Sequence, residues 1–178
     1  MIDSIISMED DATPVVLVSK DTFQDWLKSA PASTDEWLQA NRFKPKRGQH
    51  VIVPNAEGTI NCGIAGMGTQ KPRMWDVAQL ATSLPVGDYM LQATGNTLSQ
   101  DDLDNMALGW ILGGYRFDTF KKKCKFPARI SLFGDYNKER IIALSHATFL
   151  TRDRIHTPAN ILGPETFAQA STTFGGQQ

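Results

Sequence analysis

Residues 14–27, Pro-Val-Val-Leu-Val-Ser-Lys-Asp-Thr-Phe-Gln-Asp-Trp-Leu, contain the strand-to-helix transition that decides the fold class of this chain. The continuous apolar run at 15–18 predicts a buried strand. A helix is predicted directly after it, with Asp21 as its N-cap. Its apolar face, at helical spacing, is made by Phe23, Trp26 and Leu27. Pro31 ends this helix, because proline cannot continue it.

The alternation of strand and helix continues outward from this unit. Apolar runs predict further strands at 51–53, 59–65, 89–93 and 129–133. Helical spacing predicts helices after a Ser33 or Thr34 cap and over 74–83, 99–122 and 138–155. Turn residues at 55–58 join the first two of these strands as a hairpin, so the sheet is mixed. The predicted fold class is therefore α/β, a mixed β-sheet flanked by helices on both faces.

Three finer expectations accompany this fold. Residues 1–13 are acidic and lack periodicity, which predicts a loose leader. In the short helix after Pro31, Trp37 and Leu38 are expected to point inward. In the longest helix, Ser99 and Asp102 approximate a capping box, and the glycines are expected to permit close approach to a sheet or a neighbouring helix. These glycines are Gly109, Gly113 and Gly114.

Composition excludes several functional classes. The chain has 178 residues, 18 basic and 19 acidic, with a net charge of −1, so no global field attracts nucleic acid or a membrane. Its apolar runs are too short to span a bilayer. The acidic N-terminus does not resemble a signal peptide. Cys62 and Cys124 are predicted to be free thiols in a reducing cytosol.

Glycine and histidine patterns offer no specific site. Gly63, Gly66 and Gly68 have the spacing G-x-x-G-x-G, which favours a tight strand-to-helix connection over a phosphate-binding loop. The histidines are isolated from one another, and His146 is expected to be packed in the core or at an interface. His156 lies at a helix end, where a cation is favourable. No metal-ligand set emerges from these residues.

Charged clusters are predicted to be solvated. The acidic groups at 9–11 and 101–102 are assigned to the leader and to a helix N-terminus. Two basic clusters lie near phenylalanines, a pattern that also suits nucleic acid. They consist of Lys44, Lys46 and Arg47, and of Lys121, Lys122, Lys123 and Lys125. Because the overall charge is balanced, a solvated turn and helix end are favoured for these clusters.

Residues 151–165, Thr-Arg-Asp-Arg-Ile-His-Thr-Pro-Ala-Asn-Ile-Leu-Gly-Pro-Glu, form a predicted connector. A helix ends near Ile155, Pro158 stops it, and a new helix starts at Pro164, which suits the first helical position. Together with 37–51 and 107–118, this segment resembles the N-terminal region of the leucine aminopeptidases. This is a cytosolic (cytosol aminopeptidase) family of two-metal exopeptidases. His156 departs from the asparagine that is common in the family.

The resemblance implies a macro-domain-like, non-catalytic N-terminal domain at 1–136. It implies that 137–178 form a connecting helix and the start of an absent catalytic domain. In the full-length metallo-aminopeptidase, a water held by two divalent metals, zinc or manganese, attacks the N-terminal peptide bond of peptide substrates. The family signature Asn-Thr-Asp-Ala-Glu-Gly-Arg and the lysine-bearing metal motif are absent here. No catalytic, cofactor-binding or metal-ligating residue is therefore assigned, and this segment is expected to be inactive alone.

The expected role is interdomain packing on the enzyme's own catalytic domain and support of a cytoplasmic homo-hexamer. Exposed apolar surface is then expected along 141–155 and 161–167. Two alternatives remain open. One is a stand-alone macro-domain-like module that binds a nucleotide such as ADP-ribose at Gly63–Gly68. The other is a DNA-binding accessory domain that uses the basic turns.

Overall fold

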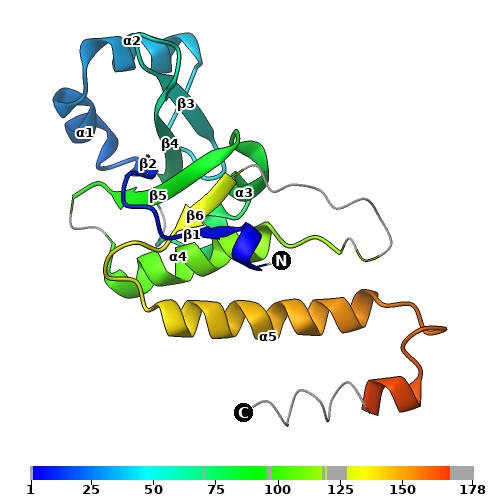
Figure 1. Ribbon diagram of the computed structural model, residues 1–178. Coiled ribbons are helices and arrows are strands. Elements are labelled where there is room, and N and C mark those ends of the chain that lie inside the picture. The colour runs from blue at the N-terminus through cyan, green and yellow to red at the C-terminus, as the bar shows by residue number, and fades with distance from the viewer. Residues whose placement is uncertain (1, 70, 96–97, 118, 120–127, 169–178) are drawn as a thin grey trace.

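A computed structural model shows a single six-stranded mixed sheet with helices on both faces (Figure 1). It describes residues 2–69, 71–95, 98–117, 119 and 128–168. The strands are β1 (Ile6–Ser7), β2 (Thr13–Ser19), β3 (His50–Pro54), β4 (Ile60–Gly68), β5 (Gly87–Ala93) and β6 (Ala128–Ser131). Their order across the sheet is β1-β6-β5-β2-β4-β3, and only β3 is antiparallel to its neighbour. The predicted α/β class and the mixed sheet are confirmed.

Helices cover the two sheet faces unequally (Figure 1). The α-helices are α1 (Phe23–Ser29), α2 (Ala32–Ala40), α3 (Leu80–Ser83), α4 (Gln100–Gly113) and α5 (Lys138–His156). The 3-10 turns are η1 (Ile2–Ser4) and η2 (Met74–Val77). Helices α4 and α5 lie on one side of the sheet, whereas α1 and α2 lie on the other, near β3 and β4. Two apolar clusters result, a large one beneath α4 and a small one beneath α1 and α2.

The run at 15–18 forms the middle of the central strand, as predicted. Val15 and Leu17 face the large cluster, whereas Val16 and Val18 face the small one. All four are at most 6% exposed, which explains why an unbroken apolar run is needed here.

The expected loose leader at 1–13 is wrong. Ile2 and Ile5 are 4% and 0% exposed, and Ile6 pairs in parallel with Ile130. The acidic residues that suggested a leader fall mostly in the exposed turn that follows β1. The isoleucines of this segment place an edge strand in the sheet. The free energy gained by burying their apolar surface exceeds the entropy cost of ordering so short a segment.

Helix α4 confirms the predicted capping box and the predicted close approach. The Asp102 N–H donates to the Ser99 hydroxyl (3.2 Å), and the Ser99 N–H donates to the Asp102 carboxylate (3.1 Å). A Cβ at Gly109 would overlap the Met74 carbonyl, and one at Gly113 would overlap the Ala78 carbonyl. The missing side chains therefore let α4 lie directly against the backbone of η2.

Several predicted boundaries and orientations are wrong. The helix expected over 99–122 ends at Gly113, because adjacent glycines weaken a helix end. The helix expected over 74–83 is divided into η2 and α3. Thr22 rather than Asp21 is the N-cap of α1, and α2 begins at Ala32, after Pro31. Trp37 is 40% exposed, because its indole N–H reaches outward to the Ile52 carbonyl (2.8 Å), whereas Leu38 is buried as expected.

Candidate interaction surface

Helix α5 packs on the domain through a narrow stripe. Its buried residues are Ile141, Ser145 and Phe149, which repeat every four positions and face the large cluster. The buried Ser145 hydroxyl donates a hydrogen bond to the Ile141 carbonyl of the same helix (2.7 Å). Only three of the nineteen residues of α5 are buried, so the described residues leave most of the helix surface uncovered.

Polar contacts hold both ends of α5 against α4. At the start, the Arg140 guanidinium donates to the Asn105 side chain (3.1 Å). At the end, the Tyr115 hydroxyl donates to Asp153 (2.7 Å) and the Arg152 guanidinium donates to the Leu112 carbonyl (2.8 Å). The guanidinium carbon of Arg152 also lies 5.2 Å from the centre of the Tyr115 ring, at cation–π distance. These contacts fix the direction in which the helix leaves the domain.

The chain after α5 turns sharply and starts a new helix, as the sequence predicts. The Ile161 and Leu162 N–H groups both donate to the Pro158 carbonyl (2.9 and 3.0 Å). Residues 164–168 are helical, and the Phe167 N–H donates to the Gly163 carbonyl (2.9 Å). The turn presents this short helical stretch below α5 in Figure 1.

Four large apolar side chains on α5 and this turn are exposed. They form what we call the α5 surface: Leu144 (41% exposed), Ile155 (76%), Ile161 (48%) and Phe167 (49%). Leu144 and Ile155 are eleven positions apart, roughly three helical turns, and so lie on the same side of α5. The expected exposure of apolar residues along 141–155 and 161–167 is confirmed. Large apolar side chains that stay exposed on one side of a helix are candidates for an interaction site.

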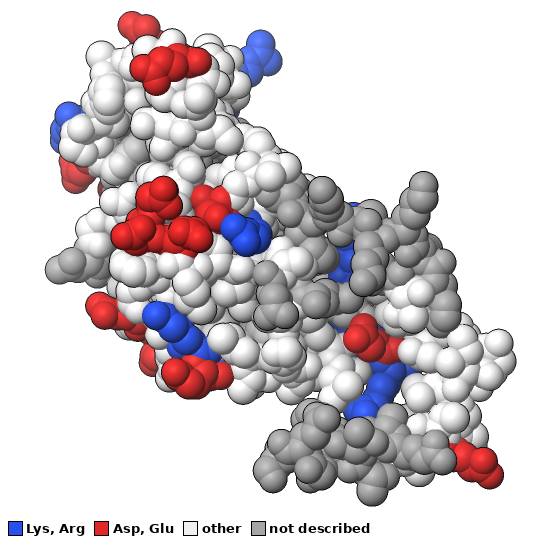
Figure 2. Space-filling view, in the orientation of Figure 1, with Lys and Arg blue, Asp and Glu red and all other residues white. Residues whose placement is uncertain are grey.

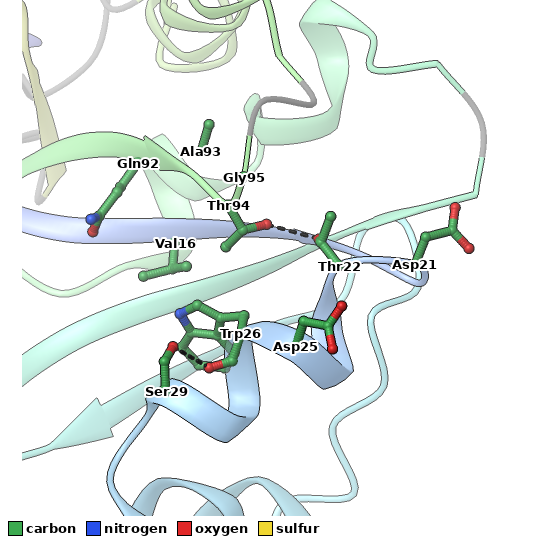
Figure 3. A pocket seen from close by; sticks show the side chains of 10 residues that line it. All are labelled: Val16, Asp21, Thr22, Asp25, Trp26, Ser29, Gln92, Ala93, Thr94 and Gly95. Atoms are coloured by element: carbon green, nitrogen blue, oxygen red, sulfur yellow. Dashed lines mark hydrogen bonds between the residues drawn. The ribbon is translucent and has the colours of Figure 1, made fainter.

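A second feature is a cavity of about 490 Å³ at the C-terminal ends of β2 and β5 (Figure 3). Its floor is held by a hydroxyl network, in which Thr22 and Thr94 share a hydrogen bond (2.8 Å) and Thr94 also donates to the Leu17 carbonyl (2.8 Å). The Trp26 ring and the Gln92 side chain also line the cavity. The threonine hydroxyls are engaged in joining two strand ends, so they are structural rather than nucleophilic.

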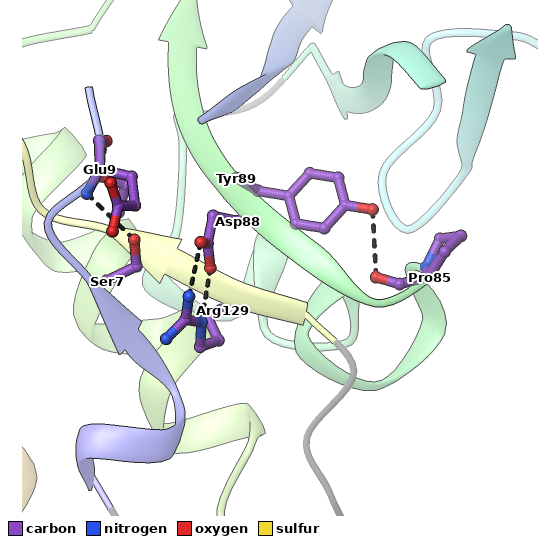
Figure 4. Close-up of polar contacts among 7 residues, drawn as sticks. Ser7, Glu9, Pro85, Asp88, Tyr89 and Arg129 are labelled. Atoms are coloured by element: carbon purple, nitrogen blue, oxygen red, sulfur yellow. Dashed lines mark hydrogen bonds and ion pairs between the residues drawn. The ribbon is translucent and has the colours of Figure 1, made fainter. Parts of the chain in front are cut away.

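An ion pair occupies the open face of the sheet (Figure 4). Arg129 on β6 donates twice to Asp88 on β5, at 2.5 and 2.6 Å, and the two residues are directly paired in the sheet register. In the same view, Ser7 and Glu9 mark the start of the acidic turn. The Ser131 hydroxyl donates to the Glu9 carbonyl (2.7 Å). Figure 2 shows acidic side chains beside a basic one on this face, with no extended field of one sign. The Asp88–Arg129 ion pair stabilises the register between β5 and β6 and does not mark a reaction centre.

The residues that the sequence singled out do not converge. Gly63 and Gly66 lie inside β4 rather than in a strand-to-helix connection, and a Cβ at Gly66 would overlap the backbone of Lys46. His146 is exposed and lies away from the buried stripe of α5, so it is not packed in the core, and its expected place at an interface stays a prediction. His156 stacks on Phe117, and its Nδ1–H donates to the Arg152 carbonyl (2.7 Å).

Other candidates are also separated. Arg47, from the first basic cluster, forms an ion pair with the buried Asp76 (3.0 Å). Cys62 is a half-buried free thiol, and burial raises its pKa. The second basic cluster and Cys124 lie outside the described residues. Within the described ranges, no three His, Cys, Asp or Glu side chains come together as a metal site would require.

Sequence reasoning missed two polar arrangements. The Thr22–Thr94 bond joins residues 72 positions apart, and the Asp88–Arg129 pair joins residues 41 apart. Neither has a local signature, since each depends on which parallel strands become neighbours. A helix able to cross a membrane is not found in the portion of the chain that the structure describes.

The fold matches that of aminopeptidase N-terminal domains. Residues 13–133, more than half of the chain, match the family described as the M17 aminopeptidase N-terminal domain, and the chain therefore belongs to that family. M17 proteins are aminopeptidases, which are hydrolases. The probable cytosol aminopeptidase of Treponema denticola is 30% identical over 86 residues, covering 42% of this chain and 18% of that protein.

Solved structures agree on the fold. The cytosol aminopeptidase of Coxiella burnetii superposes with a TM-score of 0.88 at 24% identity, covering 98% of this chain and 38% of that one. The bottromycin maturation enzyme BotP in complex with Mn superposes with a TM-score of 0.64 at 19% identity, covering 89% and 34%. The chain thus spans well under half the length of the proteins it matches.

Proposed function

We propose that this chain is the N-terminal, non-catalytic part of a cytoplasmic leucyl aminopeptidase. In the whole enzyme, two divalent metals, zinc or manganese, would sit in a separate catalytic domain and activate the water that releases N-terminal amino acids from peptides. The family match supports the aminopeptidase assignment, and the BotP complex with Mn supports the metal class. The part described here would supply binding surface rather than reacting groups.

The α5 surface is the observation that carries this proposal. Burying one large apolar side chain contributes roughly 1.5–3 kcal/mol, so leaving the apolar side chains of the α5 surface in water is unfavourable unless a partner covers them. The Phe167 ring already has the Arg154 guanidinium 5.8 Å from its centre. The exposure that calls for a partner is therefore that of Leu144, Ile155 and Ile161. These residues belong to α5 or to the turn that leaves it. The partner proposed is therefore the catalytic domain of the same enzyme, with 1–136 as the N-terminal domain and 137–178 as the connection.

Homo-hexamer formation is the second part of the role. It rests on the family resemblance and on apolar side chains that are exposed away from α5. These include Trp75 (53% exposed), Val86 (83%) and Phe133 (52%). Sedimentation of a chimera that carries a catalytic domain tests this part directly, with a hexamer expected and a monomer contradicting it.

Two enzyme assays test the main proposal. The 178-residue chain alone is expected not to release leucine from leucyl-p-nitroanilide with added zinc or manganese, and metal-dependent hydrolysis by it would contradict the proposal. A chimera in which this chain replaces the matching part of the Coxiella burnetii protein is expected to be active. Ile155→Asp together with Ile161→Asp should then lower its activity at least tenfold, because two carboxylates would replace apolar side chains at the proposed contact.

A matched variant controls for charge alone. Lys138→Asp reverses a charge in the first turn of α5, outside the α5 surface, and is expected to leave the activity of the chimera within twofold. Full activity of the Ile155→Asp and Ile161→Asp chimera would show that the α5 surface does not contact the catalytic domain.

A further inference from the structure

A separate pocket lies on the opposite side of the molecule from α5, where the first turn of α1 meets the loop that follows α2. It has a volume of about 390 Å³ and is lined by aromatic and basic side chains. We call it the lysine pocket and define it by Phe23, Phe43, Lys20, Lys44 and Lys46. Cavities of roughly 300–1,000 Å³ are the usual size of small-ligand sites.

The floor of the lysine pocket is aromatic. The Phe23 and Phe43 ring centres are 5.8 Å apart, with the ring planes tilted by 56°. Phe43 is 7% exposed and belongs to the small apolar cluster, whereas Phe23 is half-buried and offers part of its ring to the pocket. A flat apolar group could therefore stack here without disturbing the core.

The rim of the pocket is positive and unbalanced. Lys20, Lys44 and Lys46 are all exposed, and among the described contacts none of their ammonium groups forms an ion pair or a hydrogen bond. Arg47, the next residue, differs because its charge is neutralised by Asp76. No carboxylate is found among the described residues that line the pocket. Three lysines that line one pocket without an acidic partner among its described lining residues favour a bound anion.

The backbone that carries these lysines is fixed before any ligand binds. The Lys20 N–H donates to the Gly68 carbonyl, and the Gly68 N–H donates to the Pro45 carbonyl, both at 3.0 Å. Gly66 has no side chain, and this lets the backbone of Lys46 lie directly against β4. The glycine pattern in the sequence thus holds the lysine-bearing loop in place, and a preorganised site loses less entropy on binding.

We propose that the lysine pocket binds a nucleoside phosphate, with the base against Phe23 and Phe43 and the phosphates among Lys20, Lys44 and Lys46. The combination of a stacking floor and a cationic rim matches a ligand that joins a flat ring to an anion. The volume fits one nucleotide rather than a longer strand. The site is distinct from the α5 surface, and it does not depend on the proposed role of that surface.

Calorimetry on the full chain tests the proposal with four probes: ADP, inorganic pyrophosphate, adenosine and a ten-nucleotide single strand. ADP is expected to bind, and at least tenfold more tightly than either pyrophosphate or adenosine. Lys44→Ala with Lys46→Ala should weaken ADP binding at least tenfold. Lys28→Ala with Lys138→Ala removes the same charge elsewhere and should change it less than twofold.

The Phe23→Leu variant distinguishes the contribution of aromatic stacking to ADP binding from that of the lysine charges. It keeps an apolar side chain in the small cluster and is expected to weaken ADP binding at least threefold while leaving pyrophosphate binding unchanged. Amide NMR shifts on adding ADP should centre on 20–24 and 43–46. Absence of ADP binding at 5 mM, equal affinity for pyrophosphate, or shifts centred on Trp26 and Gln92 instead would overturn the proposal. Binding of the single strand more than a hundredfold tighter than ADP would also overturn it.

Discussion

Helices α4 and α5 lie side by side and are used in opposite ways. Eight of the fourteen residues of α4 are buried, including the fully enclosed Trp110 and Ile111. Only three of the nineteen residues of α5 are buried. Helix α4 is therefore an element of the core, whereas α5 is attached by one stripe and by polar contacts at its ends.

In this fold, α4 contributes to the stability of the domain, whereas α5 offers surface for contact with a partner. The glycines of α4 bring backbone against backbone, which leaves no space for another molecule. On α5, by contrast, two large apolar side chains, Leu144 and Ile155, stay exposed within the described chain. Four predictions test this contrast, from the largest expected effect to the smallest.

Gly109→Ala should have the largest effect on stability. The added Cβ would overlap the Met74 carbonyl, so η2 must move away from α4. We expect a loss of about 3 kcal/mol or more in the free energy of unfolding, more than the gain in helix propensity of roughly 1 kcal/mol. Urea denaturation measures this, and Gly163→Ala, which has open space around its Cβ, should cost less than about 0.5 kcal/mol. Equal effects of the two variants would contradict the close packing of α4.

Two truncations on α5 sharpen the comparison within a single helix. Ile141 is 0% exposed, so Ile141→Ala should cost about 3 kcal/mol. Leu144, three residues later, is 41% exposed, and Leu144→Ala should cost less than about 1 kcal/mol in the isolated chain. Thermal unfolding of both variants checks this, and a large loss for Leu144→Ala would mean that the surface is already covered.

Ser99→Ala should remove the cap of α4 at a cost of about 1 kcal/mol. Hydrogen bonds from the Ser99 side chain and backbone hold the pKa of Asp102 below its ordinary value. The folded pKa is the lower one, so this contribution is present above about pH 4 and is lost as the pH falls through the folded pKa. Unfolding at pH 6 and pH 3 should show the Ser99→Ala deficit shrinking in acid. Ser33→Ala, an exposed serine in the first turn of α2, is the control and should show no deficit.

Tyr136 gives the smallest effect, visible only at high pH. Burial, together with the nearby Asp104 carboxylate, raises the pKa of its phenol to about 12. The neutral phenol contributes stability below about pH 10, and this contribution is lost as the pH rises toward 12. Absorbance at 295 nm should show a late ionisation that is missing in Tyr136→Phe. A titration complete near pH 10 would contradict burial of Tyr136 beneath α4.

Local pattern was sufficient where a segment's neighbours lie close along the chain. The run at 15–18, the hairpin of β3 and β4 and the Ser99–Asp102 box all follow from short-range rules. Local pattern was insufficient where the position of a residue depends on a segment that is distant in the sequence. Ile6 joins the sheet only because Ile130 lies beside it, and Trp37 turns outward only because the Ile52 carbonyl is within reach. Pairing between distant residues leaves no periodic signal.

The α5 surface was predictable in position but not from α5 alone. The helix pattern at 138–155 gave its length, and the resemblance to aminopeptidases gave the reason for exposed apolar residues. The lysine pocket was not predictable, because Lys20 and Lys46 meet only through the contact of Gly66 and Gly68 with the loop at 45–49. The glycines and the lysines are visible in the sequence, but the contact by which the glycines of β4 hold the lysine-bearing loop is not.

The most direct test of the central claim is carbene labelling of the α5 surface in the isolated chain and in the chimera with the Coxiella burnetii catalytic domain. Labelling of Leu144, Ile155 and Ile161 is expected to fall at least fivefold in the chimera. Met8, exposed in the acidic turn after β1, should be labelled equally in both. Equal labelling of the α5 side chains in the two proteins would contradict the assignment of α5 as the surface that contacts the catalytic domain.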